Sequence, residues 1–565
     1  MFFVVYILFI CYIHNICTLP IRWEAKMNAK ESQIFARNHM REHWAKLSQA
    51  RACPVCHEAP IAYTFDDISI KPQEISRISS RRDAQIDLGS QISPKVRLKL
   101  PVVASYMDTV CEAKMAIAIA QLGGLGIIHR WMTIEEQVSQ VRRVKRAENE
   151  IIEDPYTLRP SSTVAEIRRA MAEYGVGGLL ITDERGKLLG IVTTRDIDFK
   201  NKEEDLSMPA TAVMTPLEKL IVASKGVTLH EAKKLLDEHK LEKIPVVDND
   251  GVVCGLISKK DIKKMRNRLA ARDDEGHLLV AASVGLRGAD LFERTGALLE
   301  AGADLIVLAI ANGYLESAIN ATRRLRKKFP DVDLAVGDVT EYAGTKRLFA
   351  AGADTVLVGI GPGSSCETRY IAGVGVPQFT ALRWAASAAR AESRYIICDG
   401  GAHEPHHFGK ALFAGASAVI LGGALAGTDE APGEVVDIGG RKMKQHRGLA
   451  SEDARAKLER ILGASPKKEN DHALQEAARF GGEDLYGEVY MHVAGEGVEQ
   501  GFVPYTGATK EAIKRLTGGL RSLMTYLGVN NLEGLWDICD MGLYISQTAY
   551  GAAEGKPHHM SVFRD

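Results

Sequence analysis

The chain has 565 residues, of which 46% are hydrophobic and 25% are charged. That length can bury more than one core, and the composition is typical of a soluble globular protein. Lysine and arginine (71) nearly balance aspartate and glutamate (72), which excludes a global electrostatic field that would attract nucleic acid or an anionic membrane. We therefore expect neither as a partner, and a charged substrate must be bound by local groups.

The N-terminus does not form a clear targeting signal. The first 20 residues are apolar and aromatic, but no lysine or arginine precedes them, and His14 and Asn15 interrupt the run before it could span a bilayer. Residues 1–26 are interpreted either as a poorly formed signal peptide or as sequence upstream of a start at Met27. The remaining chain is expected to be cytoplasmic.

The nine cysteines are scattered along the chain, which predicts a reducing compartment rather than a disulfide framework. Cys53, Cys56 and His57 have the spacing of half a zinc site. No second Cys/His pair follows at a suitable interval, so we interpret these residues as thiols without metal.

One loop combines the features of a chemical site. The apolar run at 356–358 breaks into glycines and serines at 359–365, which end on Cys366 and are followed by Thr368. Small residues let the backbone close around an ion and leave a thiol accessible. A buried structural cysteine is the alternative, but packing requires neither the small residues nor a nearby hydroxyl. We interpret Cys366 as a nucleophile.

Eight apolar segments alternate with helical stretches, and we predict that they form a TIM (β/α)8 barrel, an α/β fold. The predicted strands are 102–105, 126–130, 278–283, 304–309, 334–338, 355–359, 395–399 and 418–422. Active sites of such barrels lie at the C-terminal ends of the strands, and the loops after the seventh and eighth strands commonly bind phosphate. Here those loops contain 399–401 and 422–424, which are rich in glycine, as a phosphate cradle of bare backbone amides requires.

The segment between the second and third predicted strands is an internal repeat. Residues 190–197 recur in similar form as 255–262, each after a helix, a strand and an acidic turn. Duplicated units of this kind pack as a pair because neither buries its apolar face alone. The two copies resemble CBS domains over about residues 156–265, and the resemblance implies an adenine or guanine nucleotide effector. A module that only spaces or assembles subunits is the alternative.

These patterns divide the chain into four parts. They are a leader (1–26), an N-terminal segment with the first part of the barrel (27–150), an inserted tandem CBS module (151–266) and the remainder of the barrel (267–565). The last part includes a flap (451–495) and a C-terminal segment.

Several motifs occur in one distinctive order. They are 105–110, the CBS insertion, 361–369, 373–378, 399–401, 421–433, 447–451 and 518–522. Together they resemble the IMP dehydrogenase and GMP reductase family over nearly all of residues 63–559. The resemblance implies a purine mononucleotide substrate, a nicotinamide cofactor and a homotetramer.

The resemblance also implies residue roles. Cys366 would attack C2 of the purine, with Thr368, Glu496 and Arg479 of the flap handling protons. Substrate would be bound by Ser105, Met107, Ser364, Asp399, Gly401, Gly422, Gly423, His446 and Gly448, with Asp399 on the ribose hydroxyls and His446 where the family usually has tyrosine. The cofactor would contact Asn312, Gly313, Gly359 and Gly361. Potassium would bind the Gly361, Gly363 and Cys366 carbonyls, completed by Glu554 and Gly555 of a neighbouring subunit.

Two activities share this thiol. A dehydrogenase oxidises IMP to XMP with NAD⁺, a step of guanine nucleotide synthesis, whereas a reductase converts GMP to IMP with NADPH. The family's dehydrogenases have an Arg-Tyr pair in the flap, where this chain offers Arg479-Phe480; residues 312–314 and 525–526 also resemble the reductase. Residues 496–499, 503–505 and 554–558 and the inserted module resemble the dehydrogenase, which we favour.

Two further departures leave alternatives open. Ala309 stands where both branches normally have an aspartate that contacts the nicotinamide ribose, so the choice between NAD and NADP stays open. A nucleotide-sensing scaffold with little turnover is a third interpretation. Retention of Cys366, Thr368, Asp399 and Glu496 argues against it, because a pure sensor needs no thiol.

Overall fold

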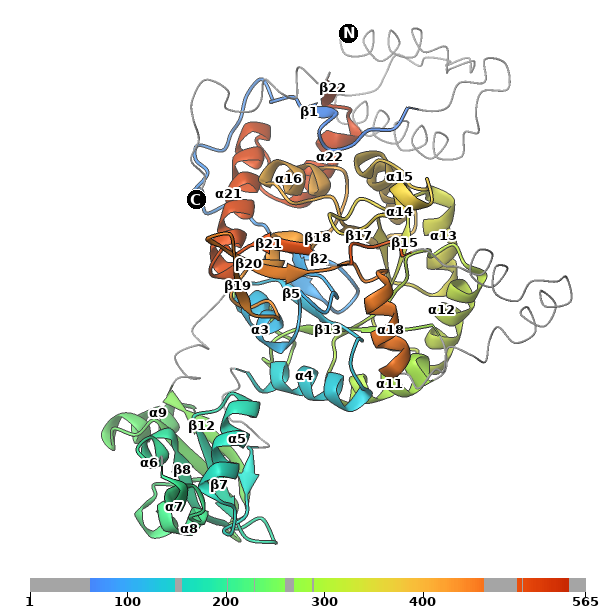
Figure 1. Ribbon diagram of the computed structural model, residues 1–565. Helices are drawn as coiled ribbons and strands as arrows, with labels where there is room; N and C mark the ends of the chain where they lie inside the picture. Colours follow the sequence, from blue (N-terminus) through green and yellow to red (C-terminus); the bar gives the residue numbers. More distant parts are fainter. Residues whose placement is uncertain are drawn as a thin grey trace, which may run out of the picture.

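The computed structural model describes residues 61–147, 155–200, 202–227, 229–259, 269–286, 289–461, 495–499 and 501–547. At its centre eight parallel strands form a closed barrel (Figure 1). In order they are β4 (Val102–Ala104), β5 (Leu125–Ile128), β13 (Val280–Val284), β14 (Leu305–Ala309), β15 (Leu334–Val339), β16 (Thr355–Val358), β17 (Tyr395–Asp399) and β18 (Ala418–Leu421). Strand β18 pairs with β4 and closes the ring. The predicted barrel is confirmed, strand for strand.

Helices surround the barrel (Figure 1). They are α3 (Ala113–Gln121), α4 (Ile134–Arg146), α11 (Ala289–Glu300), α12 (Glu316–Lys328), α13 (Tyr342–Ala351), α15 (Gln378–Ala391), α16 (Pro405–Phe413) and α21 (Thr509–Leu527). Local sequence explains where they begin and end. Helix α4, for example, begins with a reciprocal capping box between Thr133 and Glu136 and has basic residues in its last turn, which complement the helix dipole.

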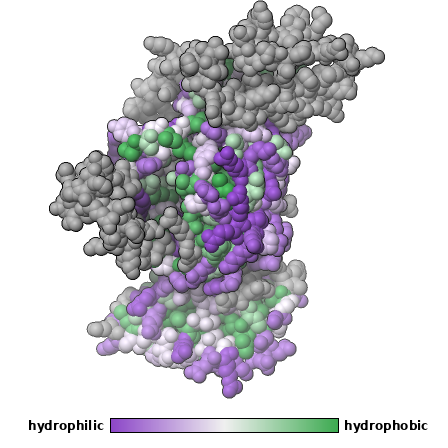
Figure 2. All heavy atoms as spheres, turned by 90° about the vertical axis from the view of Figure 1, so that its right-hand side faces the viewer, coloured by the Kyte–Doolittle hydropathy of each residue, from purple (hydrophilic) through white to green (hydrophobic). Residues whose placement is uncertain are grey.

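The barrel strands are buried on both faces. On β14, Leu305 and Val307 belong to the core inside the barrel, whereas Ile306 and Leu308 belong to the core between strands and helices. This double burial is why the strands are continuous apolar runs without alternating polar residues. Figure 2 looks onto the side where α12 and α13 lie and shows mainly hydrophilic atoms there, as expected for helices that bury one face only.

A short hairpin closes the N-terminal end of the barrel. Its strands are β2 (Ser90–Gln91) and β3 (Arg97–Leu98). Ile92, Val96 and Leu98 join the core inside the barrel, and the Ile92 carbonyl accepts a hydrogen bond from Thr355 at the start of β16. The opposite end of the barrel is therefore the one that can hold a ligand.

The insertion between α4 and β13 is a separate pair of repeats (Figure 1). The first contains β6 (Thr157–Leu158), α5 (Val164–Tyr174), β7 (Gly178–Thr182), β8 (Leu188–Thr193), α6 (Thr194–Ile197), α7 (Glu203–Leu206), α8 (Ala210–Val213) and β9 (Thr215–Pro216); the second contains β10 (Ala223–Ser224), α9 (Leu229–Glu238), β11 (Lys243–Val247) and β12 (Val253–Ser258). Leu180, Leu188 and Ile191 of the first copy share a buried cluster with Leu256 of the second. The copies therefore pack as a pair, as the repeat predicted.

The remaining elements extend the barrel at its edges. They are β1 (Ile68–Ile70), which pairs with β22 (Tyr544–Ser546), α14 (Thr368–Ile371), α17 (Gly423–Ala426), α18 (Glu452–Ile461), α22 (Leu532–Asp540) and an antiparallel sheet of β19 (Val435–Ile438), β20 (Arg441–His446) and β21 (Gly501–Pro504). Among the described residues, none of the helices combines the length and apolar character that crossing a membrane requires.

Candidate active site

Loops that follow four barrel strands surround one cleft of about 440 Å³ at the C-terminal end of the barrel. These strands are β4, β16, β17 and β18. Seven of the nine predicted substrate residues line the cleft: Ser105, Met107, Ser364, Asp399, Gly401, Gly422 and Gly423. Gly400 and Gly401 both have positive φ angles, +83° and +79°, which explains why the loop after β17 contains two consecutive glycines.

One end of the cleft consists of bare backbone and short side chains. A Cβ atom placed on Gly423 would lie 2.8 Å from Ser364 Oγ and 4.0 Å from His446 Nε2. His446 Nδ1 lies 3.0 Å from Thr109 Oγ1, whereas its buried Nε2 has no hydrogen-bond partner among the described residues. Burial lowers the pKa of His446. An unpaired ring nitrogen beside two glycines is suited to donate a hydrogen bond to a phosphate oxygen.

The middle of the cleft contains a buried acidic cluster. Tyr106 donates a hydrogen bond of 2.8 Å from its hydroxyl to Asp399 Oδ2. Burial raises the pKa of Asp399 to about 6, and this hydrogen bond opposes the rise. Burial, followed by the charges of Asp399 and Cys366, raises the pKa of Asp338 well above its usual range. Asp338 is therefore protonated when Asp399 is a carboxylate, and Asp399 can accept hydrogen bonds from a ligand.

The predicted nucleophile lies at the rim of the cleft. Cys366 is half-buried, and its Sγ lies 3.2 Å from Thr368 Oγ1, at the start of α14. Burial lowers the pKa of Arg369, and the charge of a Cys366 thiolate opposes that lowering. Arg369 donates from Nε to the Ile360 carbonyl at 3.0 Å, which holds the loop in place. A half-buried thiol with a hydroxyl beside it is suited to act as a nucleophile.

Glu496 lies beside this loop although it is 130 positions away in the chain. The Glu367 N–H donates to the Glu496 carbonyl at 2.8 Å, and Cys366 forms an isolated bridge with Gly497. Gly448 packs against the same strand, since a Cβ atom there would lie 2.6 Å from Gly497 Cα. The structure thus brings the backbone of Glu496 next to the loop that carries Cys366.

The predicted cofactor residues lie beside the cleft. Gly313 donates its N–H to the Asp338 carbonyl at 2.8 Å, and the Asn312 side chain accepts from the Tyr314 N–H at 3.0 Å. Gly359 is buried where a side chain would overlap the Asp399 carbonyl, so close packing already explains this glycine. Ala309 lies at the end of β14 and provides no carboxylate. The Gly313 N–H and the Asn312 side-chain oxygen are therefore already engaged within the protein, and position 309 offers no carboxylate to a ribose.

The predicted potassium carbonyls fit a cation only in part. Gly361, Gly363 and Cys366 belong to one turn, whose backbone oxygens are the type of donor that hard cations take. The Gly363 carbonyl also accepts a hydrogen bond of 3.1 Å from the Cys366 N–H. The other predicted ligands, Glu554 and Gly555, lie outside the described residues, as does Arg479 of the flap.

The sequence interpretation missed Tyr106 and Asp338 as site residues. Asp338 lies near the C-terminal end of β15, which is where barrel enzymes place polar site residues, so its position along the strand could have indicated it. Tyr106 lies between Ser105 and Met107, which both line the cleft. Its contact with Asp399, 293 positions away, could not be read from the local sequence.

Comparisons with known proteins agree with this geometry. The family described as IMP dehydrogenase / GMP reductase domain matches residues 62–558. The chain is 40% identical over 504 residues to inosine-5'-monophosphate dehydrogenase of Aquifex aeolicus, covering 89% of this chain and 96% of that protein. It is 41% identical over 505 residues to the enzyme of the same name from Staphylococcus aureus strain Mu50, with the same coverage.

The solved structures that it resembles include a GMP reductase. A cysteine-to-alanine variant of GMP reductase from Trypanosoma brucei, in complex with guanosine 5'-monophosphate, has a TM-score of 0.77 and 34% identity. The similarity covers 90% of this chain and all of that one. The reductase in complex with guanosine 5'-triphosphate has a TM-score of 0.67 and 32% identity, covering 87% and 99% of the two chains.

Proposed function

Because the chain belongs to the IMP dehydrogenase / GMP reductase family and is an oxidoreductase, we propose that it oxidises IMP to XMP with NAD⁺, as a step of guanine nucleotide synthesis. The dehydrogenases at 40–41% identity, which align over nearly their whole length, support this direction. The observation that carries the proposal is the Cys366 thiol, 3.2 Å from Thr368 Oγ1, at the rim of a cleft lined by Asp399 and bare glycines.

The chain's own residues would carry out most of the reaction. Ser364, Gly422, Gly423 and His446 would hold the phosphate and Asp399 the ribose hydroxyls, which places C2 of the purine above Cys366. The thiolate attacks C2, and the hydride on C2 departs with its electron pair. Bound NAD⁺ would supply the acceptor for that hydride.

Hydrolysis completes the proposed cycle. Loss of hydride leaves a thioimidate between Sγ and C2. Water adds to C2 and loses a proton, the C2–S bond breaks, and XMP leaves as the thiolate is restored. Thr368 and Glu496, with Arg479 of the flap, would take up and pass on the proton of this water. The Thr368 hydroxyl lies 3.2 Å from the thiol sulfur.

The same family membership supports three further parts of the proposal. Potassium would bind the Gly361, Gly363 and Cys366 carbonyls, and the C-terminal segment of a second subunit would complete the site in a homotetramer. The paired repeats of the insertion would bind a purine nucleotide effector. The two copies share a buried hydrophobic cluster and so form one unit.

GMP reduction is the second candidate, favoured by the structural similarity to GMP reductase and by residues 312–314. We expect reduced nicotinamide to accumulate, as its near-ultraviolet absorbance, when the full chain is given IMP and NAD⁺. Loss of that absorbance with GMP and NADPH would instead establish the reductase. Nucleotide binding without either change would indicate a sensing scaffold and contradict both enzymatic proposals.

Nucleotide binding should depend on pH through Asp399. Its carboxylate accepts the ribose hydroxyls, and its pKa is raised to about 6. The protonated form predominates below that value, so the affinity for IMP should fall as the pH is lowered through about 6. Tyr106→Phe removes the donor that stabilises the carboxylate. As the pH is lowered, this variant should therefore begin to lose affinity for IMP at a higher pH than the wild type does. Calorimetric titrations between about pH 5 and 8 measure this affinity.

The phosphate of IMP also titrates near pH 6, so a control is needed. Asp399→Asn should bind IMP more weakly throughout and retain only the pH dependence of the phosphate. If the affinity for IMP depends on pH in the same way in the wild type and in Tyr106→Phe, the Tyr106 hydroxyl does not affect the pKa of Asp399.

A further inference from the structure

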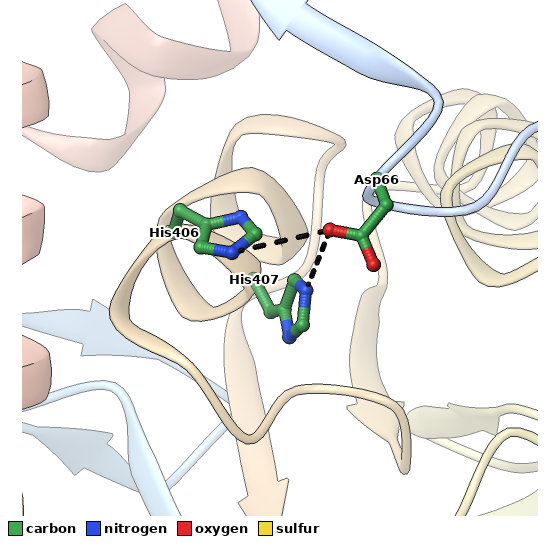
Figure 3. Close-up of side chains that lie close together, drawn as sticks. All are labelled: Asp66, His406 and His407. Carbon is green, nitrogen blue, oxygen red and sulfur yellow. Dashed lines mark hydrogen bonds and ion pairs between the residues drawn. The ribbon is translucent and has the colours of Figure 1, made fainter. Parts of the chain in front are cut away.

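A cluster of two histidines and an aspartate lies outside the substrate cleft. Asp66 lies in the turn before β1, and His406 and His407 lie in the first turn of α16. His407 Nε2 is 3.1 Å and His406 Nε2 is 3.9 Å from the same oxygen, Asp66 Oδ1. Figure 3 shows one oxygen of the Asp66 carboxylate facing a nitrogen of each imidazole ring.

A structural hydrogen bond does not account for the whole arrangement. One buried histidine on one aspartate would suffice to pin β1 to α16, and His407, with 7% of its side chain exposed, meets that need. His406 is 52% exposed, yet it also directs a ring nitrogen toward Asp66 Oδ1. The Nδ1 atom of His407 is buried without a hydrogen-bond partner among the described residues, and Nε2, the ring nitrogen that faces Asp66, would be the ligand atom.

The spacing suits a tetrahedral ion. One ligand atom from each of the three residues lies within 4.8 Å of the others. Ligands about 2.0–2.1 Å from a zinc ion in a tetrahedron lie roughly 3.3 Å from each other, so the 3.1 and 3.9 Å separations need only small side-chain shifts. Two imidazoles and one carboxylate are a donor set for zinc-like transition ions, whereas magnesium and calcium prefer oxygen ligands.

The charges around the cluster are compatible with a cation. Lys410 donates to the Phe65 carbonyl at 2.7 Å and interacts with both Asp66 and Asp67. Two carboxylates therefore face one ammonium, and the surroundings of the cluster are not net positive.

We propose that Asp66, His406 and His407 bind a divalent transition ion of the zinc class, with water as a fourth ligand. The ion would tie the segment before β1 to the start of α16. His403 precedes this helix and lines the substrate cleft, and its ring lies edge-on to His407 with centroids 4.6 Å apart. The ion would thereby stabilise the loop after β17, and it has a structural role rather than a place in the reaction.

The test uses the full chain stripped with a chelator and titrated calorimetrically with Zn²⁺ alone. The background carries Cys53→Ser and Cys56→Ser, because Cys53, Cys56 and His57 could also bind zinc. We expect this background protein to bind one equivalent of Zn²⁺ tightly and to show a melting temperature that rises with Zn²⁺ concentration but not with Mg²⁺. His406→Ala and Asp66→Asn should each weaken binding by more than about tenfold and remove the thermal shift.

Matched controls test whether the loss of zinc binding is specific to this site. His239→Ala removes an exposed histidine of the inserted repeats and should change neither the zinc affinity nor the thermal shift. His406 and Asp66 are both largely exposed, so their variants should fold, which circular dichroism without metal would verify. Cobalt substituted at this site should give visible bands without sulfur charge-transfer absorption. Unchanged zinc affinity and stoichiometry in His406→Ala and Asp66→Asn would overturn the proposal.

Discussion

Replacement of Cys366 by alanine is expected to abolish turnover while IMP still binds. In the proposed mechanism the sulfur forms and breaks the bond to C2, and the Thr368 hydroxyl beside it cannot replace a thiolate as nucleophile. We expect kcat to fall by roughly 10⁴-fold or more, as is typical when a covalent nucleophile is removed. The dissociation constant for IMP should stay within roughly tenfold, because phosphate and ribose contacts come from other residues. Steady-state rates and calorimetric titration measure the two quantities separately.

A second cysteine variant serves as the control. Cys254 lies half-buried on β12 of the insertion, so Cys254→Ala should keep both turnover and IMP binding. Incubation of the wild type with IMP and NAD⁺ should also protect Cys366 from alkylation. If Cys366→Ala loses IMP affinity and turnover by the same factor, the residue shapes the cleft and is not the nucleophile. If the variant keeps turnover, the covalent mechanism is wrong.

The largest expected loss of stability comes from Asp540→Asn. Asp540 ends α22 and forms an ion pair of 2.9 Å with Arg383 of α15, and both side chains are only 1% exposed. Arg390 donates to the other carboxylate oxygen. Removing the negative charge takes away the buried carboxylate that both guanidinium groups contact, which should cost about 3–5 kcal/mol. Thermal and urea unfolding should both show the loss.

The effect of this variant should depend on pH with a defined sign. Burial acts to raise the pKa of Asp540, but the charges of Arg383 and Arg390 outweigh it and lower the pKa. A carboxylate with a lowered pKa stabilises the fold at neutral pH and loses that contribution as the pH falls through its folded-state pKa. The difference in the free energy of unfolding between wild type and Asp540→Asn should therefore become smaller as the pH is lowered.

Glu533→Gln is the matched control for Asp540→Asn. Glu533 is an exposed acidic residue at the start of the same helix, so its loss should cost less than about 1 kcal/mol. Equal destabilisation by the two variants would show that the buried ion pair does not anchor α22.

Much of the fold could be predicted because its signals are local. Each barrel strand is a continuous apolar run, and each is followed by a helix of its own, so eight βα units could be counted from residues such as those of β14 and α12. The glycines of the phosphate loops and the serines before Cys366 are also local signals, since small residues indicate where the backbone must turn tightly. The insertion could be predicted because its sequence contains two similar copies.

Other features depend on residues that are distant in sequence, and the sequence interpretation did not contain them. It foresaw neither the pairing of β1 with β22 nor the approach of Asp66 to His406 and His407, contacts that span more than 300 positions. It placed Asp399 on the ribose, but it contained neither the burial that raises the pKa of that carboxyl nor the hydrogen bond from Tyr106 that opposes the rise.

The amino-acid sequence by itself determined the order of strands, the inserted repeats and the position of the thiol, because hydrophobic periodicity and glycine placement act over a few residues. Tertiary structure alone decided which side chains share a low-dielectric environment. Closure of the barrel through β18 and β4 brings loops from opposite ends of the chain to one cleft, and burial then sets the ionisation of the groups that meet there.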